Sequence, residues 1–310
     1  NYILNLTNNG FINGNDDDGV NIDPDDDSIV SFINNGTIQD NSYDGVDFDL
    51  DDNSQITFIN NGTIQNNGDD GVDINADDNS LINFTNNGTI SGNDDHALNV
   101  SSDDSAKVYI SNNGLIDDND GYAVELYPDD DALINFINNG TISNSSGGIY
   151  SDPTGNGVLT LSNFGTISGN AQDGYEVYSY DDSVSTLNNS GSITNNRAGI
   201  YLEISDNSSI TINNSGSISN NSNPGIEAYN YDSSQLSINN SGLIEGNGGD
   251  GILASTESPN ILYISNTGKI QNNTEYGIFA EGEGSANVVE ITNNSGVIRN
   301  NADGAIYFGA

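Results

Sequence analysis

The feature that most constrains this chain is a tripeptide, Gly-x-Ile, that recurs through all of its 310 residues. Successive copies are spaced by about 26 residues, and only a few intervals depart from this period. The anchor glycines of the twelve copies are Gly10, Gly36, Gly62, Gly88, Gly114, Gly140, Gly165, Gly191, Gly216, Gly242, Gly268 and Gly296. A fixed period of this size is the signature of repeat architectures, in which each unit packs against its neighbours. We therefore expect a stack of similar units.

Each unit contains three short apolar segments separated by polar corners. In residues 54–79, Ile56 and Phe58 alternate with polar residues, Ile64 stands between small polar neighbours, and Val72 and Ile74 alternate again. Alternation of period two is typical of strands with one buried face, and the Asn-Gly, Asp-Gly and Asp-Asp pairs between the segments are typical of turns. Three strands and three corners per unit predict an all-β fold, a right-handed parallel β-helix (β-solenoid) of about twelve coils of ~26 residues.

The repeat also predicts which residues stack on one another. We expect residues 1–310 to form a single β-solenoid domain in which Ile64 and Ile90 lie above one another in the core. Phe58 and Phe84 should form a parallel aromatic stack on the next face. Asn stands two residues before every anchor glycine, from Asn8 to Asn294, and five residues after eleven of the twelve. Asn tolerates a left-handed backbone at a corner, and identical amides one coil apart can hydrogen-bond in a ladder.

The repeat resembles that of a known class of surface proteins. Asn-x-Gly-[Thr/Ser]-Ile, followed by Gly-[Val/Ile] nine residues after the first glycine, is similar to the repeats in β-helical passenger regions of bacterial autotransporters. The resemblance covers the whole chain. It implies a right-handed parallel β-helix at the cell surface or outside the cell, in a class that includes adhesins, scaffolds and some enzymes.

The charge of the chain excludes several classes of partner. With 46 acidic and 4 basic side chains the formal net charge is −42, and such a chain repels nucleic acids and other polyanions. No apolar stretch approaches the length of roughly 18 residues that a membrane-spanning helix needs, so we expect no membrane insertion. The absence of Cys excludes thiol chemistry, and a single histidine, His96, excludes a centre built from several histidines.

Paired aspartates at one corner of the repeat are the first candidate site. They recur once in each of five successive units, so the fold should stack them about one coil apart, where like charges repel and divalent cations are attracted. Calcium takes several carboxylate and carbonyl oxygens as ligands, which makes Ca²⁺ the expected cofactor; a solvated corner screened by salt is the alternative. The candidate ligands are Asp25, Asp26, Asp51, Asp52, Asp77, Asp78, Asp103, Asp104, Asp129 and Asp130.

Catalysis has less support in the pattern. A lyase on this scaffold needs a basic groove, which four scattered cations cannot supply, and a hydrolase needs carboxylates that converge in a cleft. The carboxylates here follow the repeat, and no long loop interrupts it. We therefore expect a non-enzymatic protein, and we interpret His96, which replaces a corner Asp, as a surface substitution.

Outward tyrosines form a third candidate. Tyr127, Tyr178 and Tyr229 recur at one outward position on alternate coils. Tyrosines on an exposed strand can stack on sugars or anchor a lateral protein contact, although Tyr also suits exposed strands without any ligand.

The two ends of the sequence suggest axial assembly. The first residues read as a strand of a coil in progress and the last as a strand of an unfinished coil. If the last residue of one copy is joined to the first residue of the next, the interval between the repeat glycines that flank the junction is one residue shorter than the usual interval within the chain. This predicts either a window of a longer array or head-to-tail stacking of copies through Ile3, Leu4, Ile306 and Phe308 at uncapped ends. The leading hypothesis is thus a structural protein of an extracellular filament or adhesin stalk. The alternative is a carbohydrate-binding or carbohydrate-cleaving β-helix.

Overall fold

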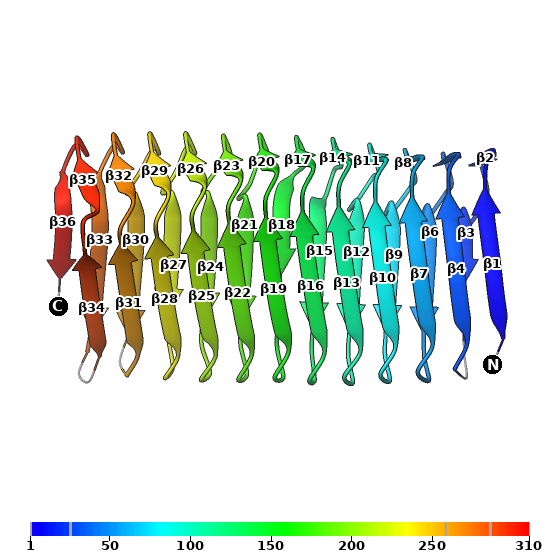
Figure 1. The fold of residues 1–310 in the computed structure, drawn as a ribbon, viewed down its shortest axis with the longest axis horizontal. Helices are drawn as coiled ribbons and strands as arrows, with labels where there is room; N and C mark the ends of the chain where they lie inside the picture. The colour runs from blue at the N-terminus through cyan, green and yellow to red at the C-terminus, as the bar shows by residue number, and fades with distance from the viewer. Residues whose placement is uncertain (1, 25–26, 258, 285–286, 310) are drawn as a thin grey trace.

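The chain forms a straight rod of stacked coils. The computed structural model describes residues 2–24, 27–257, 259–284 and 287–309, and within these ranges the chain forms β-strands and no helix. Each coil ascends on the near face, turns at the top and descends on the far face while advancing toward the C-terminus, as Figure 1 shows. This path is a right-handed parallel β-helix of twelve coils, and the predicted fold is confirmed.

Three parallel sheets of twelve strands run the length of the rod, one for each strand of the coil. Sheet A contains the first strands, each of six residues: β1 (Ile3–Asn8), β4 (Ile29–Asn34), β7 (Gln55–Asn60), β10 (Leu81–Asn86), β13 (Lys107–Asn112), β16 (Leu133–Asn138), β19 (Val158–Asn163), β22 (Val184–Asn189), β25 (Ser209–Asn214), β28 (Gln235–Asn240), β31 (Ile261–Asn266) and β34 (Val288–Asn293). Sheet B contains the second strands, each of three residues: β2 (Phe11–Asn13), β5 (Thr37–Gln39), β8 (Thr63–Gln65), β11 (Thr89–Ser91), β14 (Leu115–Asp117), β17 (Thr141–Ser143), β20 (Thr166–Ser168), β23 (Ser192–Thr194), β26 (Ser217–Ser219), β29 (Leu243–Glu245), β32 (Lys269–Gln271) and β35 (Val297–Arg299).

Sheet C contains the third strands, whose lengths vary more. They are β3 (Val20–Ile22), β6 (Val46–Leu50), β9 (Val72–Ala76), β12 (Leu98–Ser102), β15 (Tyr122–Pro128), β18 (Gly147–Ser151), β21 (Tyr175–Ser179), β24 (Ile200–Ile204), β27 (Ile226–Asn230), β30 (Ile252–Glu257), β33 (Tyr276–Glu283) and β36 (Gly304–Gly309). Because each strand pairs in parallel with the same strand of the next coil, equivalent residues lie in columns along the rod.

The inward columns make one continuous hydrophobic core. Ile64 pairs with Ile90 in register, and both are fully buried. The rings of Phe58 and Phe84 stack with centroids 4.9 Å apart at an interplanar angle of 10°, and Phe32 continues the stack at 4.8 Å from Phe58. Both core predictions are confirmed. The outward residues of the same strands are left free to vary.

Two buried amide ladders run along the corners that flank sheet B. In the first, Nδ2 of Asn60 donates to Oδ1 of Asn86, and Nδ2 of Asn86 donates to Oδ1 of Asn112, each at 2.8 Å. In the second, Nδ2 of Asn67 donates to Oδ1 of Asn93 at 2.9 Å. The predicted ladders are confirmed, but the left-handed backbone lies elsewhere, for example at Asn66 with φ 53°. The invariant asparagines are therefore explained by their amides.

The last coil departs from the predicted column. Asn294 was expected in the first ladder, but Asn293 pairs with Asn266 and accepts its amide hydrogen bond at 2.7 Å. The reason is an additional residue between Asn293 and Gly296, where Ser295 takes a positive φ of 66°. The prediction for Asn294 is wrong because equal sequence spacing from the glycine does not imply equal structural position after an insertion.

Close backbone packing explains the anchor glycines. A Cβ atom added at Gly62 would lie 1.9 Å from the carbonyl oxygen of Gly36 in the preceding coil, far inside contact distance. Because these glycines have no side chains, the backbones of successive coils can approach closely at the corner between sheets A and B.

A matched pair of substitutions tests the amide ladder. Asn86 is buried, and Asn86→Ala removes the donor to Oδ1 of Asn112 and the nearer acceptor of Nδ2 of Asn60, which keeps only its 3.4 Å contact with the carbonyl oxygen of Thr89. We expect this variant to lose about 2–4 kcal/mol of unfolding free energy. Asn87 makes equivalent hydrogen bonds to Asn61 and Asn113, but it lies exposed to water. Asn87→Ala should lose less than about 1 kcal/mol. Denaturant unfolding measures both, and equal losses would contradict a ladder that depends on burial.

Candidate functional site

The predicted aspartates form tight turns between sheets C and A. In the turn that begins at Asp77, the amide of Ser80 donates to the carbonyl oxygen of Asp77, and Asp78 and Asn79 both have positive φ. Asp104 and Ser105 repeat this geometry. Two left-handed residues in succession favour Asp, Asn and Gly, so the backbone alone accounts for part of the Asp column. Asp25 and Asp26 lie outside the described residues.

Some of these carboxylates nevertheless come close enough to share a cation. Oxygens of Asp103, Asp104 and Asp130 lie within 4.8 Å of one another. The charges of Asp129 and Asp103 raise the pKa of Asp130, and partial burial together with Asp103 and Asp51 raises that of Asp77. The corner therefore carries a repulsion that a divalent cation would relieve. Asp51, Asp52, Asp78 and Asp129 lie at the same corner in adjoining coils.

A second acidic group, at the corner between sheets B and C, was not recognised in the sequence. Asp18, Asp44 and Asp70 stack there, one on each of three successive coils. Oδ1 of Asp18 accepts the amide of Asp44 at 3.0 Å, and Oδ1 of Asp44 accepts the amide of Asp70 at 2.8 Å. Asp47 and Asp73 of sheet C bring their oxygens within 4.8 Å of those of Asp44. The signal that could have found it is the Asp that precedes the second glycine of these repeats.

Burial shifts the protonation of this second group. It raises the pKa of Asp44 to about 8, and the charges of Asp70 and Asp73 contribute in the same direction. Burial and neighbouring carboxylates also raise the pKa of Asp47 and that of Asp73 to about 6 each. Protonation is therefore one way in which the fold tolerates so many acids in one place.

His96 lies at the end of this acidic group, and its interpretation as a surface substitution is wrong. Its side chain is only 15% exposed, with Nδ1 3.1 Å from Oδ1 of Asp70 and Nε2 2.9 Å from Oε1 of Glu125. Burial alone would lower the pKa of His96, but these hydrogen bonds raise it to about 10. A protonated His96 therefore neutralises carboxylates on two coils. Three acids contact His96, and the sequence places only Asp95 beside it, with Oδ1 3.3 Å from Nε2. Asp70 belongs to the preceding coil and Glu125 to the following coil, so the sequence could not show these two contacts.

The predicted tyrosines face outward on sheet C as expected. Tyr127, Tyr178 and Tyr229 occupy the same column on alternate coils, and each is partly buried. The coils between them place Tyr150 and Tyr201 in the neighbouring column, which the sequence reading missed. The sequence contains both tyrosines, but each of these two coils is one residue shorter. Equal spacing from the anchor glycine therefore no longer marks the same column.

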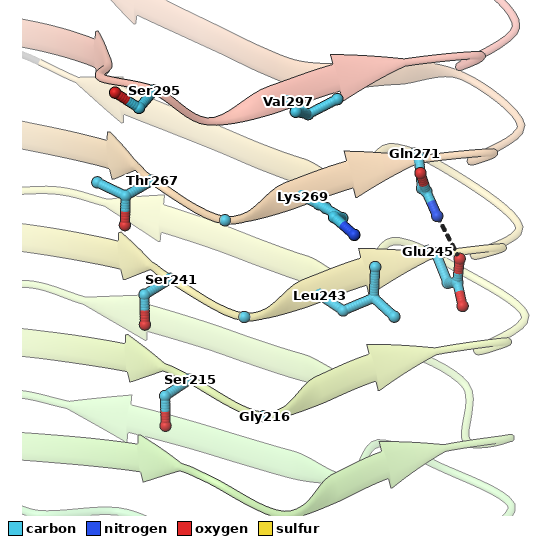
Figure 2. A pocket seen from close by; sticks show the side chains of 12 residues that line it. Ser215, Gly216, Ser241, Leu243, Glu245, Thr267, Lys269, Gln271, Ser295 and Val297 are labelled. Carbon is cyan, nitrogen blue, oxygen red and sulfur yellow. Dashed lines mark hydrogen bonds between the residues drawn. The ribbon is translucent and has the colours of Figure 1, made fainter.

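A shallow groove lies outside the corner between sheets A and B in the last four coils (Figure 2). Its volume is about 500 Å³, its floor is formed by the backbone at Gly216, Gly242 and Gly268, and hydroxyl side chains such as Ser241 line one side. Lys269 and Glu245 bring charge to the other side, where the amide of Gln271 donates to Glu245 at 2.8 Å. The lining includes Glu245 as its one carboxylate, so this groove lacks the acid pair that a glycosidase uses.

The residues predicted for axial contact differ in orientation. Leu4 faces the core opposite Val30, whereas Ile3 lies in the outward column with Ile29 and is 74% exposed. At the other end, Ile306 and Phe308 align with the fully buried Ile278 and Ala280 but are themselves 45% and 53% exposed. Leu4, Ile306 and Phe308 thus occupy inward columns in the first and last coils.

Comparisons with protein-family models, with curated proteins and with solved structures found no match. The part of the chain that the structure describes includes no helix with the length and apolar character needed to cross a membrane. The functional proposal therefore rests on the fold and on the columns of equivalent side chains along the rod.

The shifted acids predict a pH dependence of stability. Between about pH 4 and pH 8 the unfolded chain has released the Asp44 proton and the folded chain retains it, so the free energy of unfolding falls as the pH rises. His96 contributes in the same direction between pH 6.5 and about 10, because the folded chain keeps its proton longer. We expect a higher melting temperature at pH 5 than at pH 8. Asp44→Asn should flatten this dependence more than Asp94→Asn, an exposed substitution with the same charge change. Equal slopes for the two variants would refute the assignment.

Proposed function

We propose that this chain is a non-enzymatic structural protein, a rod segment of an extracellular or cell-surface filament or adhesin stalk of the β-helical passenger type. The observation that carries the proposal is the uninterrupted register of three sheets over twelve coils. A rod stiffened by continuous backbone pairing, a stacked core and two amide ladders suits the task of holding a surface at a distance.

Axial stacking on a second copy of the chain is the assembly that we propose. The core positions at the two ends, the partly buried Leu4 at one and the exposed Ile306 and Phe308 at the other, are suited to contact with another β-helical coil. Each such side chain contributes about 1.5–3 kcal/mol when fully buried. Parallel pairing across the junction would also satisfy the backbone groups of β1 and β36.

Calcium is proposed as a stabilising ion at the aspartate corner. The support is the grouping of Asp103, Asp104 and Asp130 and the asymmetry of charge, since 30 of the 46 acidic residues lie in residues 1–155. A divalent ion bound there would offset the repulsion within the column and that between stacked copies.

Chelation tests the calcium proposal. We expect the melting temperature of calcium-loaded protein to fall when a chelator is added at moderate salt, with the larger loss of amide protection in the first half of the rod. The triple variant Asp103→Asn, Asp104→Asn and Asp130→Asn should lose most of this response. The control replaces Asp94, Asp118 and Asp120, exposed aspartates at another corner of neighbouring coils. An unchanged melting curve for the parent would contradict calcium binding and support the alternative, an acidic corner that is only solvated.

Electron microscopy of the purified rod tests axial stacking. We expect fibres whose length increases with protein concentration and with calcium. Ile306→Asp combined with Phe308→Asp should shorten them, because two charges would enter the apolar junction. Val288→Asp with Val297→Asp adds the same charge to outward positions of the last coil and should have little effect. A parent that stays monomeric at high concentration, or equal lengths for both variants, would overturn stacking between copies.

A further inference from the structure

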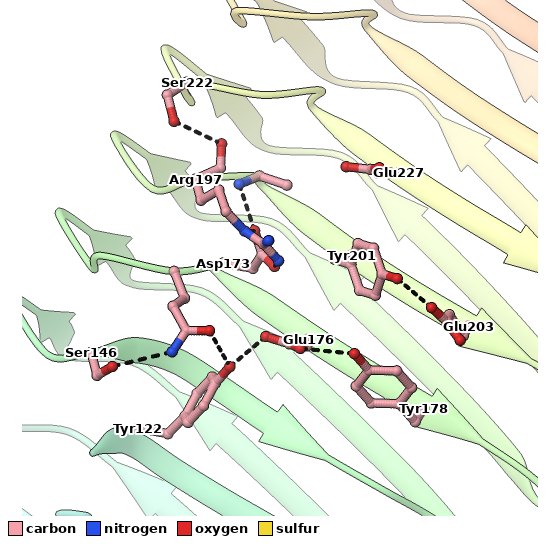
Figure 3. Close-up of polar contacts among 12 residues, drawn as sticks. Tyr122, Ser146, Asp173, Glu176, Tyr178, Arg197, Tyr201, Glu203, Ser222 and Glu227 are labelled. Carbon is pink, nitrogen blue, oxygen red and sulfur yellow. Dashed lines mark hydrogen bonds and ion pairs between the residues drawn. The ribbon is translucent and has the colours of Figure 1, made fainter.

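The charge of the chain is divided unequally between the sides of the rod. The twelve segments that run from the start of each sheet A strand to the end of the following sheet B strand contain three of the 46 acidic residues and three of the four basic ones. These segments carry no net charge, so the whole formal charge of −42 belongs to the rest of the repeat. Figure 3 shows part of the acidic side, where Asp173, Glu176 and Glu227 lie near Arg197, the one remaining basic residue. Sheets A and B therefore form a neutral side of a strongly acidic rod.

Sheet A gives this neutral side a wide and partly apolar face. Each of its strands has six residues, and the first outward column contains large apolar side chains that are partly buried or exposed. They include Ile29, Leu81, Leu133, Val184, Ile261 and Val288. Two copies of the chain can bring such faces together while their acidic sides stay apart.

Sheet A carries one basic and one acidic side chain, and neither has a partner. Lys107 lies on the outer side of β13, and Glu290 lies on the outer side of β34, seven coils further along the rod. Both side chains are exposed, and among the described residues no ion pair reaches either of them. An opposite charge on a second copy would satisfy both.

The same two strands carry a protruding side chain and a hollow. Tyr109, the third residue of β13, points outward and is 39% exposed. Glu290, the third residue of β34, lies in the same column at the hollow. The hollow opens on sheet A with a volume of about 250 Å³ and is lined by Tyr263, Ile264, Ser265, Glu290 and Thr292. Shape and charge thus both relate β13 to β34.

From these features we propose that sheet A is a self-association face, through which two copies of the chain pair side by side in antiparallel orientation. A two-fold axis along the strand direction, between β22 and β25, places β13 of each copy opposite β34 of the other. Tyr109 then stands over the hollow of the second copy. Lys107 lies two residues, about 6.7 Å along the strand, from Glu290 of the second copy, which is within reach of its side chain. Symmetry forms each contact twice.

The same pairing matches apolar residues and covers enough area. It places β16 opposite β31, so Leu133 meets Ile261 of the second copy. Eight facing strands of six residues cover about 20 Å by 38 Å, roughly 760 Å² per copy. Specific complexes bury about 800 Å² per partner. Both sheet A faces are then covered and the acidic sides point outward, so the lateral assembly ends at two copies.

A parallel pair fits these observations less well. In it each coil would face its own equivalent, and Lys107 would remain about 34 Å along the axis from either copy of Glu290. The proposal goes beyond axial stacking and does not depend on it, because the contacts lie on the side of the rod and not at its ends.

Charge reversal with rescue tests the pairing. Sedimentation equilibrium measures the dissociation constant of the dimer in the parent and in the Ile306→Asp, Phe308→Asp variant, whose axial contact is impaired. We expect a dimer in both. In either background, Lys107→Glu should weaken the dimer about tenfold, because it places like charges together twice, and Lys107→Glu with Glu290→Lys should restore it to within about threefold. Lys269→Glu makes the same change of charge on sheet B and should weaken the dimer less than about twofold.

Three results would overturn the proposal. One is a parent that stays monomeric at high concentration. Another is a double variant that associates no more tightly than Lys107→Glu alone. The third is association that disappears with Ile306→Asp and Phe308→Asp, because it would assign all contact between copies to the ends of the rod.

Cross-linking tests the orientation, since the chain contains no Cys of its own. Ser111→Cys and Thr292→Cys place thiols at the fifth position of β13 and of β34. The two thiols are seven coils apart within one copy and adjacent across the antiparallel pair. A short bismaleimide should link the double variant into dimers and leave each single variant monomeric. Dimers of Ser111→Cys alone would show parallel pairing, and no dimers of the double variant would show no pairing; either result contradicts the model.

Apolar positions test the register. Leu133→Asp with Ile261→Asp should abolish the dimer. Ile29→Asp with Leu81→Asp adds the same charge to the same column on β4 and β10, outside the paired strands, and should weaken it less than about threefold. Equal effects of the two pairs would refute the register, and thermal melting verifies that each variant folds. A neutral cello-oligosaccharide is titrated in parallel. If the parent stays monomeric and binds this sugar, and Leu133→Asp with Ile261→Asp abolishes the binding, the face is a sugar site and the proposal is wrong.

Discussion

The in-register stacking of like residues is the constraint on which the rest of this structure depends. Each coil contacts only the coils before and after it, so every residue must be compatible with its equivalent one turn away. Asparagine solves this at the corners, since an amide both donates to the next copy and accepts from the previous one. A buried carboxamide that lost its register would leave two polar groups unsatisfied. The amide ladders therefore fix the register that the hydrophobic columns alone would allow to slip.

The interior could be predicted from the sequence because it follows the period. Ile64 and Ile90, like Phe58 and Phe84, lie where counting one repeat along the chain places them. The outer surface could be predicted only in part. Tyr127, Tyr178 and Tyr229 were placed correctly, but Tyr150 and Tyr201 entered the pattern through coils shorter by one residue. In these coils the number of residues after the anchor glycine no longer gives a residue's position around the coil.

His96 shows the second limit of sequence reasoning. A histidine in place of a corner Asp looks like an isolated surface change, yet it contacts Asp70 on one neighbouring coil and Glu125 on the other. Its charge state is set by groups that are remote in sequence and close only after folding. The same applies to Asp44, whose pKa depends on burial that no local pattern reveals. The repeat predicts where each residue lies, whereas the charge state of a side chain depends on the residues that surround it in the fold.

The repeated interior leaves the outward columns free to carry different chemistry along the rod. The first coils stack aspartates at two corners, the middle coils present outward tyrosines on sheet C, and the last coils open a groove beside Lys269. None of these changes alters an inward column, so each surface can vary without a cost in core packing. On such a scaffold, binding need not depend on a cleft. An extended partner laid along the axis meets successive coils at a nearly constant spacing, and its affinity can grow with the number of coils that it spans.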